Sequence, residues 1–154
     1  MAGNTVQIHK TGSEYILKVA MTGEVTRVTS VTMGLFNDSI DNLNHDSDMS
    51  DITTEPNDGN YSAQNIDLDT DSSSAVDNGF WKVQFSPVDF DVADTTGDVD
   101  SYYFSITYQS EGDTSATEHL LFTGSLDQTY SLSELNVFNI DENTIALRMR
   151  PFNC

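Results

Sequence analysis

The sequence predicts an all-β protein, a β-sandwich or jelly-roll-like barrel with at most one short N-terminal helix. Runs of alternating apolar and polar residues of strand length recur along the chain, and most of its aromatic residues fall within them. Clusters of Gly, Asp and Ser separate these runs, as in sandwiches and barrels. With 154 residues, of which 37% are hydrophobic, the chain can bury one core, so we expect a single domain spanning residues 1–154.

The N-terminal part predicts one short strand and one short helix. Residues 5–9 alternate and indicate either a strand or an N-terminal arm, with His9 as an exposed polar residue. Residues 13–23 predict a helix, with Ser13 as the N-cap and Gly23 as the terminator. Four apolar residues between them fall at helical spacing: Tyr15, Ile16, Val19 and Ala20. Two of these are β-branched, which leaves a strand as the alternative.

The middle of the chain predicts strands separated by polar segments. Residues 27–36 alternate as a strand whose inward face would carry Val31, Met33 and Leu35. The segment 57–60 is a strong turn signal, and residues 61–68 show an imperfect strand pattern. We interpret the polar stretch 69–79 as a connection that buries nothing.

The second half predicts β structure throughout. Residues 79–86 and 102–109 are the clearest strands, and they supply the predicted core: Trp81, Phe85, Tyr102, Phe104, Ile106 and Tyr108. Residues 88–100 alternate apolar residues with Asp, which is typical of a sheet edge protected by charge. Three further β segments are expected at residues 118–124, 126–140 and 144–150.

The charge of the chain is extreme. Its 25 Asp and Glu face only six Lys and Arg, for a formal net charge of -19. A phosphate backbone would be repelled, so we expect no nucleic-acid partner. Such repulsion loosens a fold at low ionic strength and is screened at molar salt, which favours a halophile's protein. Because Trp81, the eight Phe and the six Tyr lie in strand-like runs, a disordered acidic chain is the weaker reading. The sequence has no apolar run of membrane-spanning length and no signal-peptide core near Met1, so we expect neither a membrane partner nor secretion by a signal.

The acidic loop of residues 38–51 is the segment most suggestive of a metal site. Asp46, Asp48 and Asp51 superficially resemble a calcium loop, but the glycine and glutamate required by an EF-hand are not at its offsets. A different Ca²⁺ or Mg²⁺ site and a solvated loop both remain open. His45 stands alone, without a second His or Cys at ligand spacing, so we assign no metal ligand and no cofactor.

Catalysis has little support in the sequence. Motifs such as GxSxG, HExxH and a phosphate-binding glycine loop do not occur, and the single cysteine is Cys154. The nearest candidate pair is Glu118 and His119, but adjacent residues of a strand point to opposite faces. We therefore predict a protein that is not an enzyme, with no catalytic residue.

One stretch, residues 33–64, carries a recognisable pattern. Its order of GLFNDS, an acidic loop and DITTEPNDGNYSAQ resembles the GL-[YF]-ND…TEPSGxxYARQ signature of a family of virion proteins from haloarchaeal tailed viruses, which are similar to phage head-fibre and tail-fibre proteins. The segment 114–130 also resembles those proteins, whereas Ser62 and Ala63 depart from the usual Tyr-Ala-Arg order. The matching positions, called here the signature residues, are Gly34, Leu35, Asn37, Asp38, Thr54, Glu55, Pro56, Gly59, Tyr61, Ala63 and Gln64.

The resemblance implies a structural subunit of a haloarchaeal tailed virus, most simply a decoration or turret protein on the outside of the head. Its partners would be further copies of itself and other virion proteins such as the major capsid protein. The basic segment 147–152, with Arg148, Arg150 and Phe152, is a candidate docking surface. The alternative is that its arginines only reduce the negative charge at the end of a strand. A tail or fibre component that contacts the host, and a halophilic cellular binding domain, are the alternatives.

Overall fold

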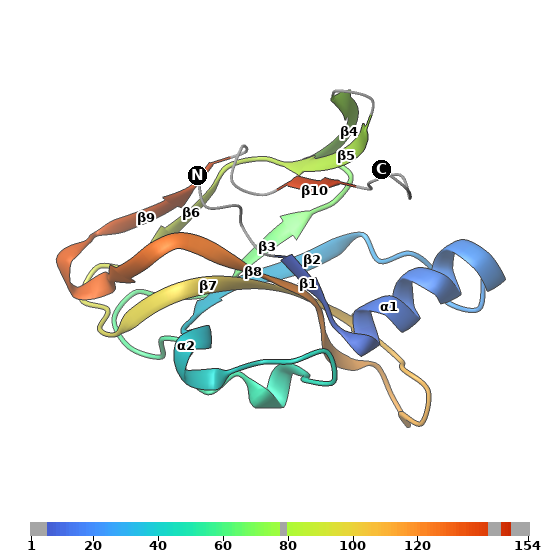
Figure 1. Cartoon of the computed structure of the whole chain (residues 1–154), viewed down its shortest axis with the longest axis horizontal. Helices are drawn as coiled ribbons and strands as arrows, with labels where there is room; N and C mark the ends of the chain where they lie inside the picture. Colours follow the sequence, from blue (N-terminus) through green and yellow to red (C-terminus); the bar gives the residue numbers. More distant parts are fainter. Residues whose placement is uncertain (1–5, 78–79, 142–145, 149–154) are drawn as a thin grey trace.

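Two layers of antiparallel strands build the protein in a computed structural model that describes residues 6–77, 80–141 and 146–148 (Figure 1). The larger layer is a five-stranded sheet in the order β1-β8-β7-β2-β3. Its strands are β1 (Val6–Ile8), β2 (Ser30–Phe36), β3 (Gln64–Asp67), β7 (Asp98–Tyr108) and β8 (Thr117–Ser131). The other layer holds a sheet in the order β10-β5-β4 and the pair β6-β9. These strands are β4 (Ser72–Asp77), β5 (Phe80–Phe85), β6 (Val88–Asp91), β9 (Val137–Ile140) and β10 (Ala146–Arg148).

Among the residues that the structure describes, helical structure is confined to short segments. The helix α1 (Lys10–Leu17) continues into the π-helix η1 (Lys18–Thr22). The remaining elements are one-turn segments: α2 (Asp38–Asp41), η2 (Met49–Asp51) and η3 (Leu132–Glu134). The predicted all-β, sandwich-like fold is confirmed. These strand orders do not establish the jelly-roll alternative.

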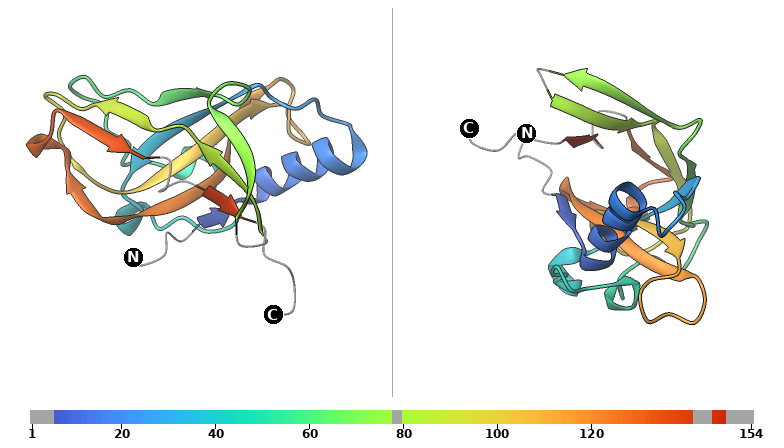
Figure 2. Two further views of the ribbon diagram at one scale, coloured as in Figure 1. Left: turned by 90° about the horizontal axis from the view of Figure 1, so that it is seen from above. Right: turned by 90° about the vertical axis from the view of Figure 1, so that its right-hand side faces the viewer.

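The main core lies between the two layers, which Figure 2 shows edge-on in its right-hand view. Phe104 of β7 is at its centre, because its ring lies 4.6 Å from that of Phe122 and 5.0 Å from that of Phe85. The predicted core residues within the described burial data are all buried: Phe85, Tyr102, Phe104, Ile106 and Tyr108. The side chain of Trp81 lies outside the described residues.

A second, smaller core lies on the opposite face of the large sheet. Phe36, Tyr103 and Leu120 point to that face and are buried. They are covered by three apolar side chains of the segment between β2 and β3, which are Leu43, Met49 and Ile52. The acidic loop is therefore only partly solvated, because its apolar residues pack against this face of the sheet.

The N-terminal helix is confirmed, but it starts earlier than predicted. It begins at Lys10 with His9 as the N-cap, so Ser13 lies inside the first turn. His9 was expected to be exposed, and this was wrong, since its ring is fully buried between Asn44 O and Thr123 Oγ1, each 2.9 Å away. Gly23 ends the helical segment at φ 66°, as predicted.

Two predicted boundaries in the β structure were wrong. The stretch 69–79 was interpreted as a connection, yet β4 lies within it and pairs with β5 along its length. Its SSSAVD sequence lacks apolar alternation, so only the partner strand reveals it. The segments 118–124 and 126–140 were also separated at Ser125, whereas β8 continues through that position to Ser131.

Candidate functional site

Glu55, Tyr61 and the backbone of Leu35 are the signature residues that meet around the carboxylate of Glu55. The side chain of Glu55 accepts hydrogen bonds at Oε1 from Tyr61 Oη at 2.9 Å and Tyr103 Oη at 2.8 Å. The phenol oxygen of Tyr61 in turn accepts a hydrogen bond from Leu35 N at 2.8 Å, and the Tyr61 ring stacks on Phe90. Glu55 and its two phenols, called here the Glu55 bracket, therefore tie the TEP segment to β2 and β7.

Gly34 makes room for this arrangement. It pairs with Tyr103 across β2 and β7, and the Tyr103 ring lies directly over it. A Cβ at Gly34 would overlap this ring, with Tyr103 Oη only 2.5 Å away. Gly59 serves the same segment in another way, because its φ of 61° is one that L side chains rarely adopt, and it packs against the backbone of Asp94.

A second set of hydrogen bonds joins the two halves of the signature. Asn37 N donates to Thr54 Oγ1 at 2.8 Å, and that hydroxyl donates to Asp41 Oδ2 at 2.7 Å. Asp41 also accepts from Thr53 Oγ1 at 2.6 Å. The GLFND and TEP motifs, separated by the acidic loop in sequence, are thus held side by side by side-chain contacts.

Asp100 of β7 holds the start of α2 in place. Its carboxylate accepts from Asp38 N at 2.8 Å, from Ser39 N at 3.2 Å and from the Ser39 hydroxyl. Partial burial raises the pKa of Asp100, but the hydrogen bonds from Ser39, Ser101 and Asp38 outweigh it and leave this pKa below its usual value. The carboxylate therefore caps the first turn of α2.

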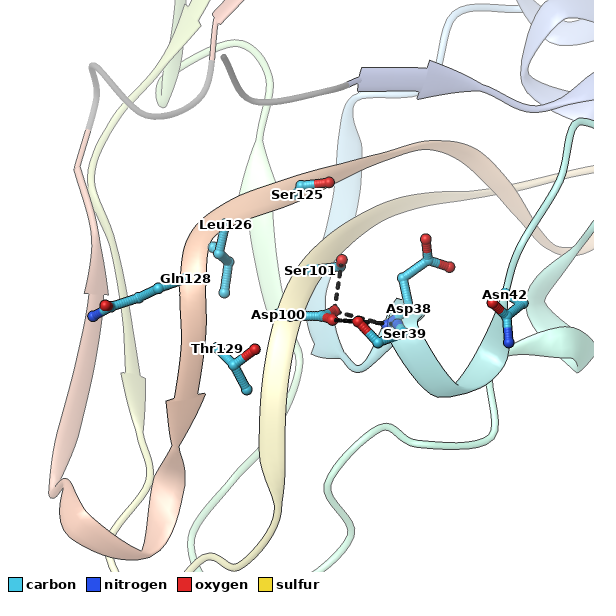
Figure 3. Close-up of a pocket in the computed structure, with 9 residues that line it drawn as sticks. All are labelled: Asp38, Ser39, Asn42, Asp100, Ser101, Ser125, Leu126, Gln128 and Thr129. Atoms are coloured by element: carbon cyan, nitrogen blue, oxygen red, sulfur yellow. Dashed lines mark hydrogen bonds between the residues drawn. The ribbon is translucent and has the colours of Figure 1, made fainter. Parts of the chain in front are cut away.

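Beside this cap lies an open polar hollow of about 380 Å³ (Figure 3). Figure 3 shows the Asp38, Ser39 and Asp100 cluster on one side and side chains of β8 on the other. Its lining is mainly hydroxyl, amide and carboxylate groups: Asp38, Ser39, Asn42, Asp100, Ser101, Ser125, Leu126, Gln128 and Thr129. Such a surface can hydrogen-bond a hydroxyl-rich ligand.

The Glu55 bracket gives a testable effect on stability. Burial raises the pKa of Glu55 against the opposing hydrogen bonds from Tyr103 and Tyr61. Glu55 therefore ionises at a higher pH in the folded chain than in the unfolded chain. Stability falls as pH rises from the unfolded-state pKa to the folded-state pKa. We expect Glu55→Gln to keep both phenol bonds and change the free energy of unfolding by less than about 1 kcal/mol, whereas Glu55→Ala lowers it by about 2 kcal/mol.

Chemical denaturation of both variants at neutral pH measures these values. A Gln variant as unstable as the Ala variant would show that the carboxylate charge, rather than its acceptor oxygen, holds the bracket.

A buried histidine fastens the acidic loop to another part of the sheet. His119 of β8 has Nδ1 at 2.6 Å from Asp48 Oδ2 and Nε2 at 2.8 Å from Asp113 Oδ2. Asp48 Oδ1 also accepts from Leu120 N at 2.7 Å. Burial lowers the pKa of His119, but the two carboxylates outweigh it and leave this pKa raised. His119, Asp48 and Asp113, called here the His119 clamp, are held together best when the ring is protonated.

The His119 clamp predicts a pH dependence of stability. A raised folded-state pKa means that the contribution is complete below the ordinary value of 6.5 and is lost as pH rises through the raised value. We expect the unfolding midpoint to fall by about 3 °C between about pH 6 and pH 9, and this slope to flatten in His119→Gln. Thermal melts at constant salt measure it, with the exposed His45→Gln as control. An unchanged slope in His119→Gln would contradict the assignment.

The structure places the other predicted residues as follows. Arg148 lies in β10, where its backbone pairs with Lys82 of β5, while Arg150 and Phe152 lie outside the described residues. Pro56 is buried, and Gln64 opens β3 opposite Met33. Glu118 and His119 have separate partners, since Glu118 accepts from Ser105 Oγ at 2.6 Å.

The carboxylates of the acidic loop accept hydrogen bonds from other groups of the same chain. Asp38, Asp41, Asp48 and Asp51 each accept hydrogen bonds from backbone or side-chain groups of the chain. Within the described ranges, no group of three or more His, Cys, Asp or Glu is arranged to hold a metal ion. None of the helices described there is long and apolar enough to cross a membrane.

Sequence reasoning missed Tyr103, Asp100 and Asp113 as parts of these networks. Tyr103 and Asp100 lie 48 and 62 positions from their partners Glu55 and Asp38, so the fold brings them together, whereas Asp113 lies only six positions from His119. Searches of protein families, of curated proteins and of solved structures found no significant match to this chain.

Proposed function

We propose that the protein is a non-enzymatic structural subunit of a haloarchaeal tailed virus particle, carried on the outside of the head as a decoration or turret protein. The observation that carries the proposal is the convergence of the signature residues. Glu55, Tyr61 and Gly34 meet at the Tyr103 side chain, and Asn37 and Thr54 are joined by a second set of hydrogen bonds. Residues that fix the architecture in this way suit a coat subunit, because its task is to hold one shape.

The distribution of acidic residues supports the same proposal. Carboxylates such as Asp46, Asp69 and Asp89 lie on exposed positions across the molecule. At molar salt the Debye length is about 3 Å, so neighbouring carboxylates hardly repel one another while each keeps its water. A particle surface in brine would remain hydrated and soluble in this way.

The polar hollow of Figure 3 favours a second candidate, a tail or fibre component that contacts the host. Its hydroxyl, amide and carboxylate lining suits a glycan on a cell surface. Decoration of the head remains the first proposal, because the groups of the signature residues bond to one another rather than facing a ligand.

The proposal is tested by the protein content of particles. Virus particles released from cells that carry the gene are purified on a density gradient, and their proteins are quantified by mass spectrometry. We expect the chain at a fixed ratio to the major capsid protein, in many copies. A chain recovered only in the cell fraction would contradict the proposal and favour the cellular binding domain.

A further inference from the structure

Part of the acidic loop crosses the outer face of the large sheet as a compact strap. We call residues 43–52 the strap, and Figure 1 shows the segment between α2 and β3 on the side of the large sheet away from β5 and β10. The two ends of the strap are held together by Asp41, whose carboxylate accepts from Thr53 Oγ1 at 2.6 Å and from Thr53 N at 3.1 Å. A surface loop whose ends are joined in this way can move as one unit.

Hydrogen bonds within the strap maintain its shape. Asp48 and Asp51 form a capping box around η2, and Asn44 N donates to Ser47 Oγ at 2.9 Å. Because both partners of each of these bonds belong to the strap, the bonds do not depend on the sheet beneath it. The position of the strap is therefore decided by its contacts with α1 and the sheet.

The strap covers a core that is separate from the main one. Its apolar side chains Leu43, Met49 and Ile52 pack on the second core, on the outer face of the large sheet. The main core lies on the other face, and none of its described residues belongs to the strap. Lifting the strap therefore leaves the pairing of β2, β7 and β8 in place and requires much less free energy than global unfolding.

Two histidines outside the strap fasten it to the rest of the fold. His9, the N-cap of α1, has Nδ1 2.9 Å from Asn44 O and Nε2 2.9 Å from Thr123 Oγ1 of β8. His119 of β8 has Nδ1 2.6 Å from Asp48 Oδ2. The two rings therefore hold the strap at positions only four residues apart.

His9 holds the strap as a neutral ring. Burial lowers its pKa most strongly, and the charge of His45 lowers it further, while Asn44 O, Asp48 and Asp38 act in the opposite direction and are outweighed. A neutral ring suffices for the contact, because a carbonyl oxygen needs only the Nδ1 proton. A second proton, taken up as pH falls, places a charge in this buried site and favours release of the strap.

His119 holds the strap as a protonated ring. Burial lowers its pKa, but the carboxylates of Asp48 and Asp113 outweigh it and leave this pKa raised. Hydrogen bonds keep the pKa of Asp113 below its usual value, and burial raises the pKa of Tyr108, whose ring lies 5.3 Å from the imidazole. Loss of the His119 proton as pH rises removes the charge that binds Asp48, which favours release of the strap.

We propose that the strap is a pH-gated cover, which His9 and His119 hold closed over the second core near neutral pH and release as a unit in more acidic and more alkaline solution. Its release uncovers the side chains of Phe36, Tyr103 and Leu120, which are at most 2% exposed in the closed protein. The closed form thus hides an apolar surface that the open form presents.

The signs of the two contributions follow from proton linkage. The His9 contribution is fully present above the ordinary histidine pKa of 6.5 and is lost as pH falls through the lowered value of the closed form. The His119 contribution is fully present below 6.5 and is lost as pH rises through its raised value. The strap is therefore held most tightly near pH 6.5.

Hydrogen exchange followed by mass spectrometry at about pH 5, 6.5 and 9, at constant salt, tests the proposal. Each peptide is compared with the same peptide of the unfolded chain at the same pH, which removes the intrinsic pH dependence of exchange. Strap peptides should be most protected near pH 6.5 and lose at least about fivefold of that protection at each extreme. Peptides of β5 and β7 should not follow this profile.

Two variants separate the contributions of the rings. His119→Gln should remove the loss of protection between about pH 6.5 and 9 and keep the loss at about pH 5, and His9→Gln should do the reverse. The control is His45→Gln, at the exposed third histidine of the chain. It should keep both losses, with the acidic one slightly displaced because the charge of His45 also acts on His9.

An NMR titration of the parent chain gives a reading that needs no variant. The ring protons of His9 and His119 should titrate on opposite sides of pH 6.5. Two rings that titrate on the same side would overturn the proposal. So would strap peptides whose protection follows that of β7 at every pH, or whose pH profile is the same in all three variants.

Discussion

Replacing Gly34 by alanine is expected to lower the free energy of unfolding by about 3 kcal/mol. The added Cβ would overlap the Tyr103 ring, which is buried at 2% exposure between the sheet and the acidic loop. Because the clash involves the hydroxyl end of the ring, a shift of the ring away from the methyl group displaces Tyr103 Oη from Glu55 and weakens their hydrogen bond. Overpacking and a lost buried hydrogen bond then add together, so this single methyl group has a large effect.

Chemical denaturation of Gly34→Ala against the parent chain measures this loss. The matched control is Gly112→Ala, at a glycine with φ 92° and open space around its Cβ position, which should lose only about 1 kcal/mol through backbone strain. Equal losses in the two variants would show that the ring over Gly34 yields easily and that the Glu55 bracket is not tightly packed.

The stability of the whole fold is expected to rise steeply with salt. The 25 acidic residues outnumber the basic ones by 19, and at about 0.1 M NaCl the Debye length of ~10 Å lets neighbouring carboxylates repel one another. At about 3 M NaCl this repulsion is screened, while the short contacts inside the Glu55 bracket and the His119 clamp are kept. We expect the unfolding midpoint to rise by more than about 10 °C between these conditions.

Circular dichroism melts at the two salt concentrations measure the shift. Sucrose at matched osmolality is the control, because it favours compact states without screening charge. Identical melting at low and high salt would count against a halophile's protein, and an equal effect of sucrose would show that charge screening is not the cause.

The elements that the sequence predicted well are those with regular alternation. β2, β5 and β7 alternate apolar residues over a strand length, and each was found close to its observed position. β4 was missed because its SSSAVD sequence does not alternate apolar and polar residues. Its strand structure depends on pairing with β5. The helix start was misplaced at Ser13 because His9 looked like a surface residue, and its burial depends on Asn44 and Thr123.

The contacts of the candidate site residues were harder to predict from the sequence than the strands. The signature residues were singled out by their order in the sequence. Their contacts also need Tyr103, which lies 48 positions from Glu55, and Asp100, which lies 62 positions from Asp38. The partner of His119 within the acidic loop, Asp48, is 71 positions distant. Local spacing cannot reveal contacts that are created by strand register, so the sequence suggested the motif without its geometry.

The most direct test of the proposed place on the virus head is gold labelling of intact particles with antibodies against this chain, viewed by electron microscopy in high salt. Antibodies against the major capsid protein mark the head as the reference. We expect gold distributed over the outer surface of the head. Gold confined to the tail or its fibres would contradict the head assignment and favour a host-contacting component, and particles without any label would contradict a place on the virion surface.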